Sequence, residues 1–111
     1  MNHNKLHCYE LLLGIAKTVP ALLKSLPKGE GFLADQLKRA LISGILNLSE
    51  GNSRTSIKER NRFFDISLAS IAETSSAIDI MASFGYIKIE ESLKLKMKLS
   101  TAIKMISRLK C

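Results

Sequence analysis

Four segments of the chain carry apolar residues at steps of three and four, the spacing that places side chains on one face of an α-helix. The only strand-like stretch, "YIKI" at residues 86–89, is short and isolated. The pattern therefore predicts an all-α protein. The expected core positions, segment by segment, are Tyr9, Leu12, Ala16, Val19, Leu23 and Leu26; Leu37, Leu41, Ile45 and Leu48; Ile57, Phe64, Leu68, Ile71, Ser75, Ile78 and Ala82; and Leu95, Leu99, Ala102, Ile106 and Leu109.

Three short joints separate these segments. The first is "LPKGEG" at residues 26–31, and Gly51 and Gly85 suit the left-handed position that follows a helix. Ser56 and Glu59 have the spacing of a capping box that opens the third helix. Pro20 is expected to kink or locally loosen the first helix. Because short joints force successive helices to run antiparallel, residues 1–111 are predicted to form a single up-down-up-down four-helix bundle.

The chain is basic. Seventeen Lys and Arg residues against ten Asp and Glu give a net charge of +7. Such a surplus attracts polyanions, either nucleic acid or an anionic membrane surface; the alternative is a solvated helix face that keeps the protein soluble. We expect Arg54, with the backbone amides of Asn52 and Ser53, to receive a phosphate. The candidate nucleic-acid-binding residues are Lys38, Arg39, Arg54, Lys58, Arg62, Lys94, Lys98 and Arg108.

No catalytic motif is recognisable. Gly51 is not followed by the Gly-Lys-Ser/Thr of a phosphate-binding loop. His3 and His7 are one helical turn apart beside Cys8, but no second cluster supplies further metal ligands. We therefore expect a non-enzymatic protein with no cofactor and no metal.

The chain shows no signal-peptide layout, and its longest uncharged run, residues 40–49, is too short to span a bilayer. A cytoplasmic protein that does not use the membrane is expected. In that compartment Cys8 and Cys111 should be free thiols, with a disulfide between the two termini as the minor alternative.

Two groups of residues are candidates for structural or interface roles. Asn47, Glu50 and Glu73 are polar residues beside apolar stripes, and we expect a hydrogen-bond network that links the second and third helices.

Apolar residues also lie outside the four main stripes. Leu93 and Met97 lie opposite the main stripe of the fourth helix, and Phe63 and Met81 lie to one side of the third. Surplus exposed apolar residues suggest subunit contacts, although scattered surface leucines are normal.

Residues 36–87 carry a further pattern: Q-L-K-R-A, a serine, N-x-x-E-G, R-x-S-x-K-E, a phenylalanine, S-x-x-E and G-Y. This run resembles the four-helix-bundle proteins encoded in intervening sequences of bacterial 23S ribosomal RNA genes. It departs from that family at Gly44-Ile45-Leu46, where Ile-Pro-Ala is common, and at Arg60, where an aromatic residue is common. The matching positions are Gln36, Leu37, Lys38, Arg39, Ala40, Ser43, Asn47, Glu50, Gly51, Arg54, Ser56, Lys58, Glu59, Phe63, Ser70, Glu73, Gly85 and Tyr86.

The resemblance implies a bundle that assembles into a ring, commonly a homopentamer, with no established enzymatic activity. It assigns Asn47, Glu50, Ser70 and Glu73 first to the fold or the subunit interface. A more distant relative is the accessory variability determinant of diversity-generating retroelements, a basic pentameric bundle that binds a reverse transcriptase and nucleic acid. Two functional hypotheses follow: an oligomer that binds RNA or DNA electrostatically, or a scaffold that docks onto a partner enzyme such as a reverse transcriptase.

Overall fold

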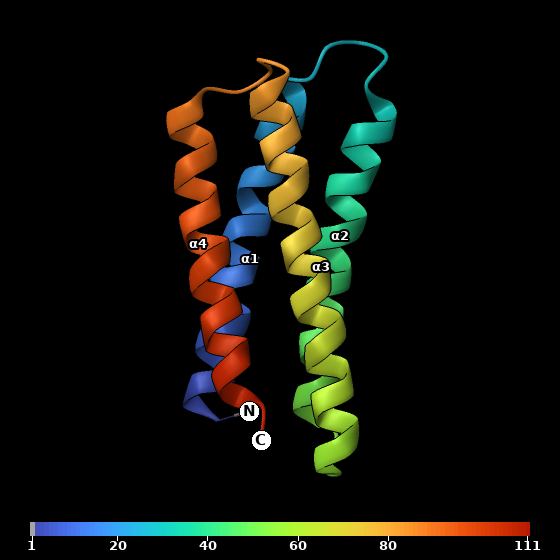
Figure 1. Cartoon of the computed structure of the whole chain (residues 1–111), viewed down its shortest axis with the longest axis vertical. Coiled ribbons are helices and arrows are strands. Elements are labelled where there is room, and N and C mark those ends of the chain that lie inside the picture. The colour runs from blue at the N-terminus through green and yellow to red at the C-terminus, as the bar shows by residue number, and fades with distance from the viewer. Residues whose placement is uncertain (1) are drawn as a thin grey trace.

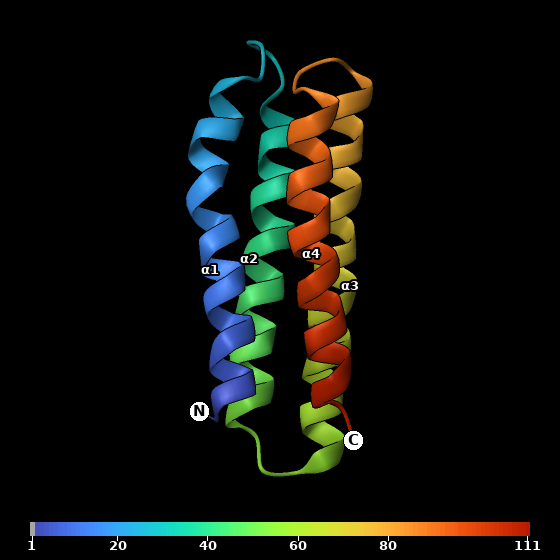
Figure 2. The ribbon, with the colours of Figure 1, turned by 90° about the vertical axis from the view of Figure 1, so that its left-hand side faces the viewer.

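The computed structural model describes residues 2–111 and shows four helices: α1 (His3–Lys24), α2 (Gly31–Ser53), α3 (Ile57–Ser83) and α4 (Ile89–Leu109). Consecutive helices run in opposite directions, and α4 returns to lie beside α1 (Figure 1, Figure 2). The bundle measures 45 × 23 × 19 Å. The prediction of an all-α, antiparallel four-helix bundle is confirmed.

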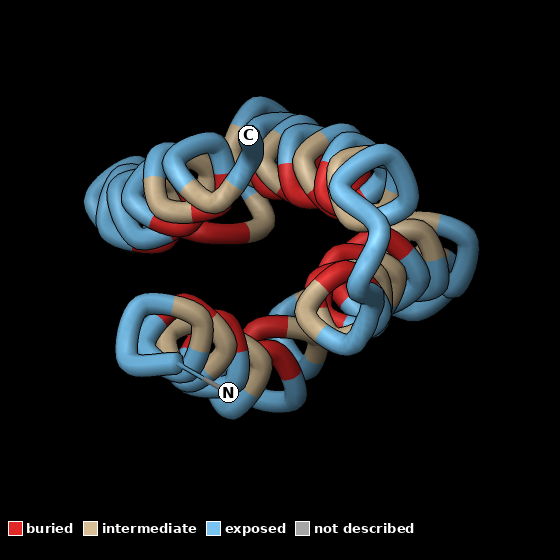
Figure 3. Tube along the Cα trace, turned by 90° about the horizontal axis from the view of Figure 1, so that it is seen from below, coloured by how far each residue is buried: buried red, intermediate tan, exposed pale blue. Residues whose placement is uncertain are grey.

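The buried residues face the centre of the bundle from all four helices (Figure 3). On α2 all the predicted core residues are buried, and on α4 all are buried except Leu109, which is partly buried. These two stripes are therefore confirmed.

The buried face of α1 is centred about one residue away from the predicted stripe. Tyr9, Ala16 and Leu23 are only partly buried, because α1 packs against both α2 and α4 and its flanks are shared between the two neighbours. The fully buried residues of α1 are Cys8, Leu12, Ile15, Val19 and Leu22.

The buried band of α3 is broader than the predicted stripe. Ile57 is exposed because it opens the helix at the end of the bundle, whereas Met81, predicted as surplus apolar surface, is fully buried. Ser67, Ser70 and Thr74 are also buried. Helix α3 packs against both α2 and α4, so it needs a wider buried face than a single stripe provides.

The joints near Gly85 and Ser56 follow the sequence closely. Gly85 has φ +78°, and the N–H groups of Gly85 and Tyr86 donate to the carbonyls of Ala82 and Met81 at 3.0 and 2.9 Å. These two bonds form the Schellman motif that ends α3. At the start of α3, the Ser56 hydroxyl accepts from the Glu59 N–H at 3.3 Å. Helix α1 continues through Pro20 to Lys24, so the proline does not end it.

By length and composition, α1 is one helix that could cross a membrane. Here it packs against α2 and α4 with its apolar face in the core. Both cysteines are free, as predicted: Cys8 is buried and Cys111 is exposed. Burial raises the pKa of the Cys8 thiol to about 11.

Candidate nucleic-acid interface

The α2–α3 joint differs from the predicted one. Gly51 does not adopt a left-handed conformation; it lies inside α2, which continues to Ser53. A Cβ atom on Gly51 would lie 2.5 Å from the Phe64 ring, so this position requires glycine for close packing between α2 and α3. The backbone amides of Asn52 and Ser53 therefore lie within α2, where N–H groups bond to carbonyls one turn earlier. The phosphate site predicted on these amides is wrong.

Three side chains at this joint form a stack. The Arg54 guanidinium lies 5.1 Å from the centroid of the Phe63 ring, and the Arg62 guanidinium lies 4.4 Å from the same centroid. Arg54 comes from the end of α2, whereas Phe63 and Arg62 lie on α3. We call Arg54, Phe63 and Arg62 the guanidinium stack.

Each arginine of the guanidinium stack is also held by a carboxylate. Arg54 Nη2 donates to Glu50 Oε2 and Arg62 Nε donates to Glu59 Oε2, both at 2.8 Å. The hydrogen bond and the charge of Arg62 lower the pKa of the Glu59 carboxyl, and the charges of Arg54 and Lys58 act in the same direction. Positive charge is therefore concentrated at this joint. The Glu59 carboxylate, predicted to close the capping box, is engaged with Arg62 instead.

Phe63 was predicted as a subunit contact, and its contact with the two arginines was not predicted. Phe63 follows Arg62 directly, but the proximity of Arg54 depends on how tightly the joint folds back. The sequence did contain a signal for this contact, because Phe63 is an aromatic residue that lies among basic residues next to a joint between two helices.

Arg60 is not part of the guanidinium stack. Its Nε atom, with both polar side-chain atoms of Asn52, is shielded from solvent and has no hydrogen-bond partner in residues 2–111. Arg60 is partly buried, whereas Arg62 is exposed. The two residues therefore present different faces, as their separation of about 200° on the helical wheel predicts.

The other predicted basic residues are not gathered at this joint. Lys38 and Arg39 are exposed near the opposite end of α2; Lys38 lies about 24 Å from Arg54 along the helix, at about 1.5 Å per residue. On α4, Lys94 and Lys98 line a surface depression shared with α1, and Arg108 lines another near the C-terminus. Arg108 lies at the same end of the bundle as the α2–α3 joint, since Cys111 bonds to Asn61 of α3. The candidate residues therefore lie along the length of the bundle, and Arg54, Lys58 and Arg62 are those grouped at the joint itself.

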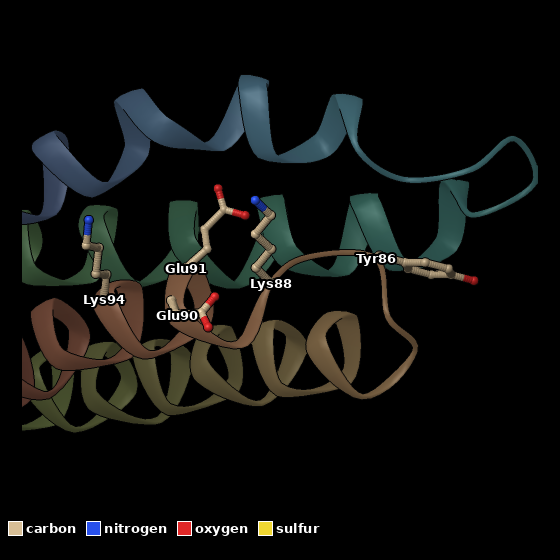
Figure 4. Close-up of a pocket in the computed structure, with 5 residues that line it drawn as sticks. All are labelled: Tyr86, Lys88, Glu90, Glu91 and Lys94. Carbon is tan, nitrogen blue, oxygen red and sulfur yellow. The ribbon is translucent and has the colours of Figure 1, made fainter.

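A surface depression of about 560 Å³ lies at the far end from this joint. Lys88, Glu90, Glu91 and Lys94 line it, together with Tyr86, which points away toward the end of the bundle (Figure 4). A hydrogen bond to Glu30 raises the pKa of Tyr86. With two carboxylates beside two ammonium groups, this depression does not favour an anion.

Two lysines, one on α4 and one just after it, form ion pairs with aspartates of α3. Lys96 Nζ lies 2.7 Å from Asp79 Oδ1, and Lys110 pairs with Asp65. The four ion pairs of the described residues use equal numbers of cations and carboxylates, so the net charge of +7 remains on unpaired side chains.

The polar network between α2 and α3 contains only part of the predicted set. Asn47 Nδ2 donates to the Ser43 carbonyl at 2.8 Å, and the hydroxyls of Ser43 and Ser70 lie 2.8 Å apart. Glu50 and Glu73 are exposed and do not join it, because Glu50 faces Arg54 and Glu73 lies outside the buried band of α3. The structural role predicted for Asn47 and Ser70 therefore agrees with this network, whereas Glu50 and Glu73 were predicted to join it and face solvent instead.

Leu93 and Met97 lie on the outer surface of α4, with exposed fractions of 53% and 71%. His3 and His7 have ring centroids 4.8 Å apart at the start of α1. Among residues 2–111, no group of three His, Cys, Asp or Glu side chains could hold a metal ion.

Residues 4–108 match the family described as 23S rRNA-intervening sequence protein. The chain belongs to this family. No curated protein matches the sequence significantly. The match spans all four helices, so the family resemblance seen in residues 36–87 extends to α1 and α4.

Proposed function

We propose that the protein is a non-enzymatic, cytoplasmic homo-oligomer that binds RNA or DNA through electrostatic contacts. The observation that carries this proposal is the unpaired charge of +7 on a small bundle, together with two arginines and a lysine around one exposed joint. A surface of this kind attracts nucleic acid by releasing the cations condensed on phosphates. The candidate residues along α2 and α4 extend the contact beyond the joint.

Salt dependence tests this binding directly. We expect fluorescence anisotropy with a labelled RNA hairpin to give an affinity that falls steeply as salt rises, since each neutralised duplex phosphate adds about 0.9 to the logarithmic slope. Replacing Arg54 and Lys58 by Gln should lower that slope by roughly 1–2. Lys17→Gln, an exposed charge on α1, is the matched control. Binding that is absent or insensitive to salt would contradict the proposal.

The oligomer is supported by exposed apolar residues on two different helices. On α2, Phe32 and Leu46 are 79% and 60% exposed, and on α4, Leu93 and Met97 are similarly exposed. Helices α2 and α4 lie on opposite sides of the bundle (Figure 1). A contact between two different faces is heterologous, and such contacts close into rings when the rotation permits. The number of subunits, five, rests on the family resemblance alone.

Paired variants test a heterologous contact. Leu46→Glu should disable the α2 face and Met97→Glu the α4 face, so each variant alone should be monomeric. Mixed together, the two variants should form a one-to-one dimer, because each retains the face that the other lacks. If both variants remain monomeric in the mixture, or if the unmodified protein is itself a monomer, the heterologous ring is excluded.

A second candidate function is a scaffold that docks onto a partner enzyme. The exposed residues Ile89, Leu93 and Met97 recur at four-residue steps on the outer side of α4 and favour protein contact. A reverse transcriptase as that partner, and kinship with the accessory proteins of diversity-generating retroelements, rest on the resemblance alone. Co-expression with a reverse transcriptase encoded beside the gene tests this candidate, and Met97→Glu should abolish co-purification.

A further inference from the structure

The guanidinium stack brings two cations from different helices onto one aromatic ring. Like charges this close repel each other, so the arrangement needs compensation. The negative face of the Phe63 ring supplies part of it, and Glu50 and Glu59 supply the rest. The ring thus holds two otherwise flexible, half-exposed side chains beside each other, while the carboxylates offset part of their charge.

Both guanidinium groups retain free donors. An arginine has five N–H donors, and the carboxylates engage Nη2 of Arg54 and Nε of Arg62. The two arginine side chains are 49% and 56% exposed. Their remaining N–H groups can therefore bind an incoming anion without any change in the fold.

The charge around the stack favours one more anion. Arg54, Arg62 and the exposed Lys58 carry three positive charges against the two carboxylates of Glu50 and Glu59. Because both arginines lie against the same ring, they can face the phosphodiester backbone of a single strand.

From this geometry we infer that the guanidinium stack is a phosphate clamp for the nucleic-acid backbone, with Phe63 as its positioning residue and Glu50 and Glu59 as carboxylates that compete with the incoming phosphate. The inference rests on the proposed nucleic-acid binding and adds to it a defined site. Phe63 acts by fixing the arginines rather than by touching a base. Its loss should therefore weaken binding while leaving the charge of the site unchanged.

Variants at Phe63 separate positioning from charge. Phe63→Leu should weaken RNA-hairpin binding about three- to tenfold, since two side chains lose their fixed orientation. The salt slope should stay close to that of the unmodified protein, because both charges remain. By contrast, Arg54→Gln or Arg62→Gln should lower the slope by about 0.7–0.9 each.

Two controls accompany this comparison. Phe63→Tyr keeps the ring and should bind like the unmodified protein. Phe84→Leu removes an exposed ring at the opposite end of the bundle and should have no effect. Thermal unfolding of each variant verifies that the bundle remains folded. If Phe63→Leu binds as tightly as the unmodified protein while that binding remains salt-dependent, the clamp is refuted and the proposed function stands.

Removing a competing carboxylate should change the RNA affinity in the opposite direction to removing Phe63 or an arginine. Glu59→Gln should tighten RNA binding about two- to fivefold, because it removes a negative charge that competes with phosphate. A residue that only supported the fold would leave the affinity unchanged or weaken it. Either of those results would contradict the role assigned to Glu59.

Inorganic phosphate separates failure of the clamp from failure of the proposed function. In an NMR titration, phosphate should shift the side-chain Nε–H signals of Arg54 and Arg62 more than those of Arg39 and Arg108. If RNA does not bind but these shifts occur, the proposed function fails and the anion site remains. If RNA binds without any shift in the two arginines, the clamp fails alone.

Discussion

The α2–α3 seam and the α1–α4 seam belong to the same bundle but are held by different means. Between α2 and α3, Gly44 and Gly51 bring the helices so close that added Cβ atoms would lie 2.8 Å from Ile71 and 2.5 Å from Phe64. The Ser67 hydroxyl donates to the Gly44 carbonyl at 2.6 Å across this seam.

The α1–α4 seam lacks this close approach. Its buried residues are mainly large aliphatic side chains, and its cross-helix hydrogen bond from the Cys8 thiol to the Ala102 carbonyl is long, at 3.8 Å. Shallow depressions run along its surface. Close packing at glycines and hydrogen bonds from hydroxyl groups therefore hold α2 against α3. Burial of large apolar side chains holds α1 against α4.

This difference explains which parts of the structure the sequence could predict. Apolar stripes predict burial of large side chains, so the helices and most of the core were predicted correctly. The role of Gly51 was not, because the same glycine near a joint suits either a left-handed cap or a close helix contact. Gly85 has no added-Cβ contact within 4 Å and a positive φ, and there the cap prediction holds.

The candidate site was predicted less well than the fold. Arg54, Lys58 and Arg62 were identified from charge alone, but their grouping around Phe63 depends on where α2 ends and how the joint turns. Lys38 is equally basic in sequence and lies near the opposite end of α2, whereas Arg108 lies on α4 at the same end of the bundle as the joint but outside the stack. Composition gives the amount of charge, and only the packing of the helices gives its distribution.

The largest expected effect is at the tight seam. Gly51→Ala should destabilise the protein by about 2–3 kcal/mol in urea unfolding, because the new methyl overlaps the Phe64 ring and lies in tight contact with the Arg60 carbonyl. Combining it with Phe64→Leu should give less than the sum of the two single effects. Gly44→Ala should also destabilise the protein, because its methyl would lie 2.8 Å from Cγ1 of the fully buried, β-branched Ile71. Full additivity of the first pair would contradict the proposed close contact.

The second effect concerns the α1–α4 seam and pH. The pKa of Cys8 rises from 9.0 to about 11 on folding, so between these values the unfolded chain releases a proton that the folded chain keeps. Stability contributed by the neutral thiol is therefore present below pH 9 and lost as the pH rises toward 11, by about 2–3 kcal/mol in total.

Unfolding at several pH values checks this effect against Cys8→Ala. The variant has no thiol at this position, so its stability should fall less steeply between pH 9 and 11. Parallel pH profiles for the two proteins would show that Cys8 is not protected by burial in the seam.

The smallest effect should be a gain in stability. Gly14 lies in the middle of α1, is exposed, and a Cβ atom there would meet nothing within 4 Å. Gly14→Ala should therefore stabilise the protein by about 0.5–1 kcal/mol through helix propensity. In thermal unfolding, Gly14→Ala should raise the melting temperature and Gly51→Ala should lower it, as expected if only the α2–α3 pair is packed closely at a glycine. A lower melting temperature for both variants would contradict this difference between the two helix pairs.

This bundle is proposed to assemble into an oligomer that binds nucleic acid through charge. Light scattering on the purified protein, with and without a structured RNA at low and moderate salt, tests it most directly. The expected mass is a multiple of the 12.3 kDa chain, increased by RNA at low salt and not at moderate salt. A monomer whose mass is unaffected by RNA at low salt would contradict it.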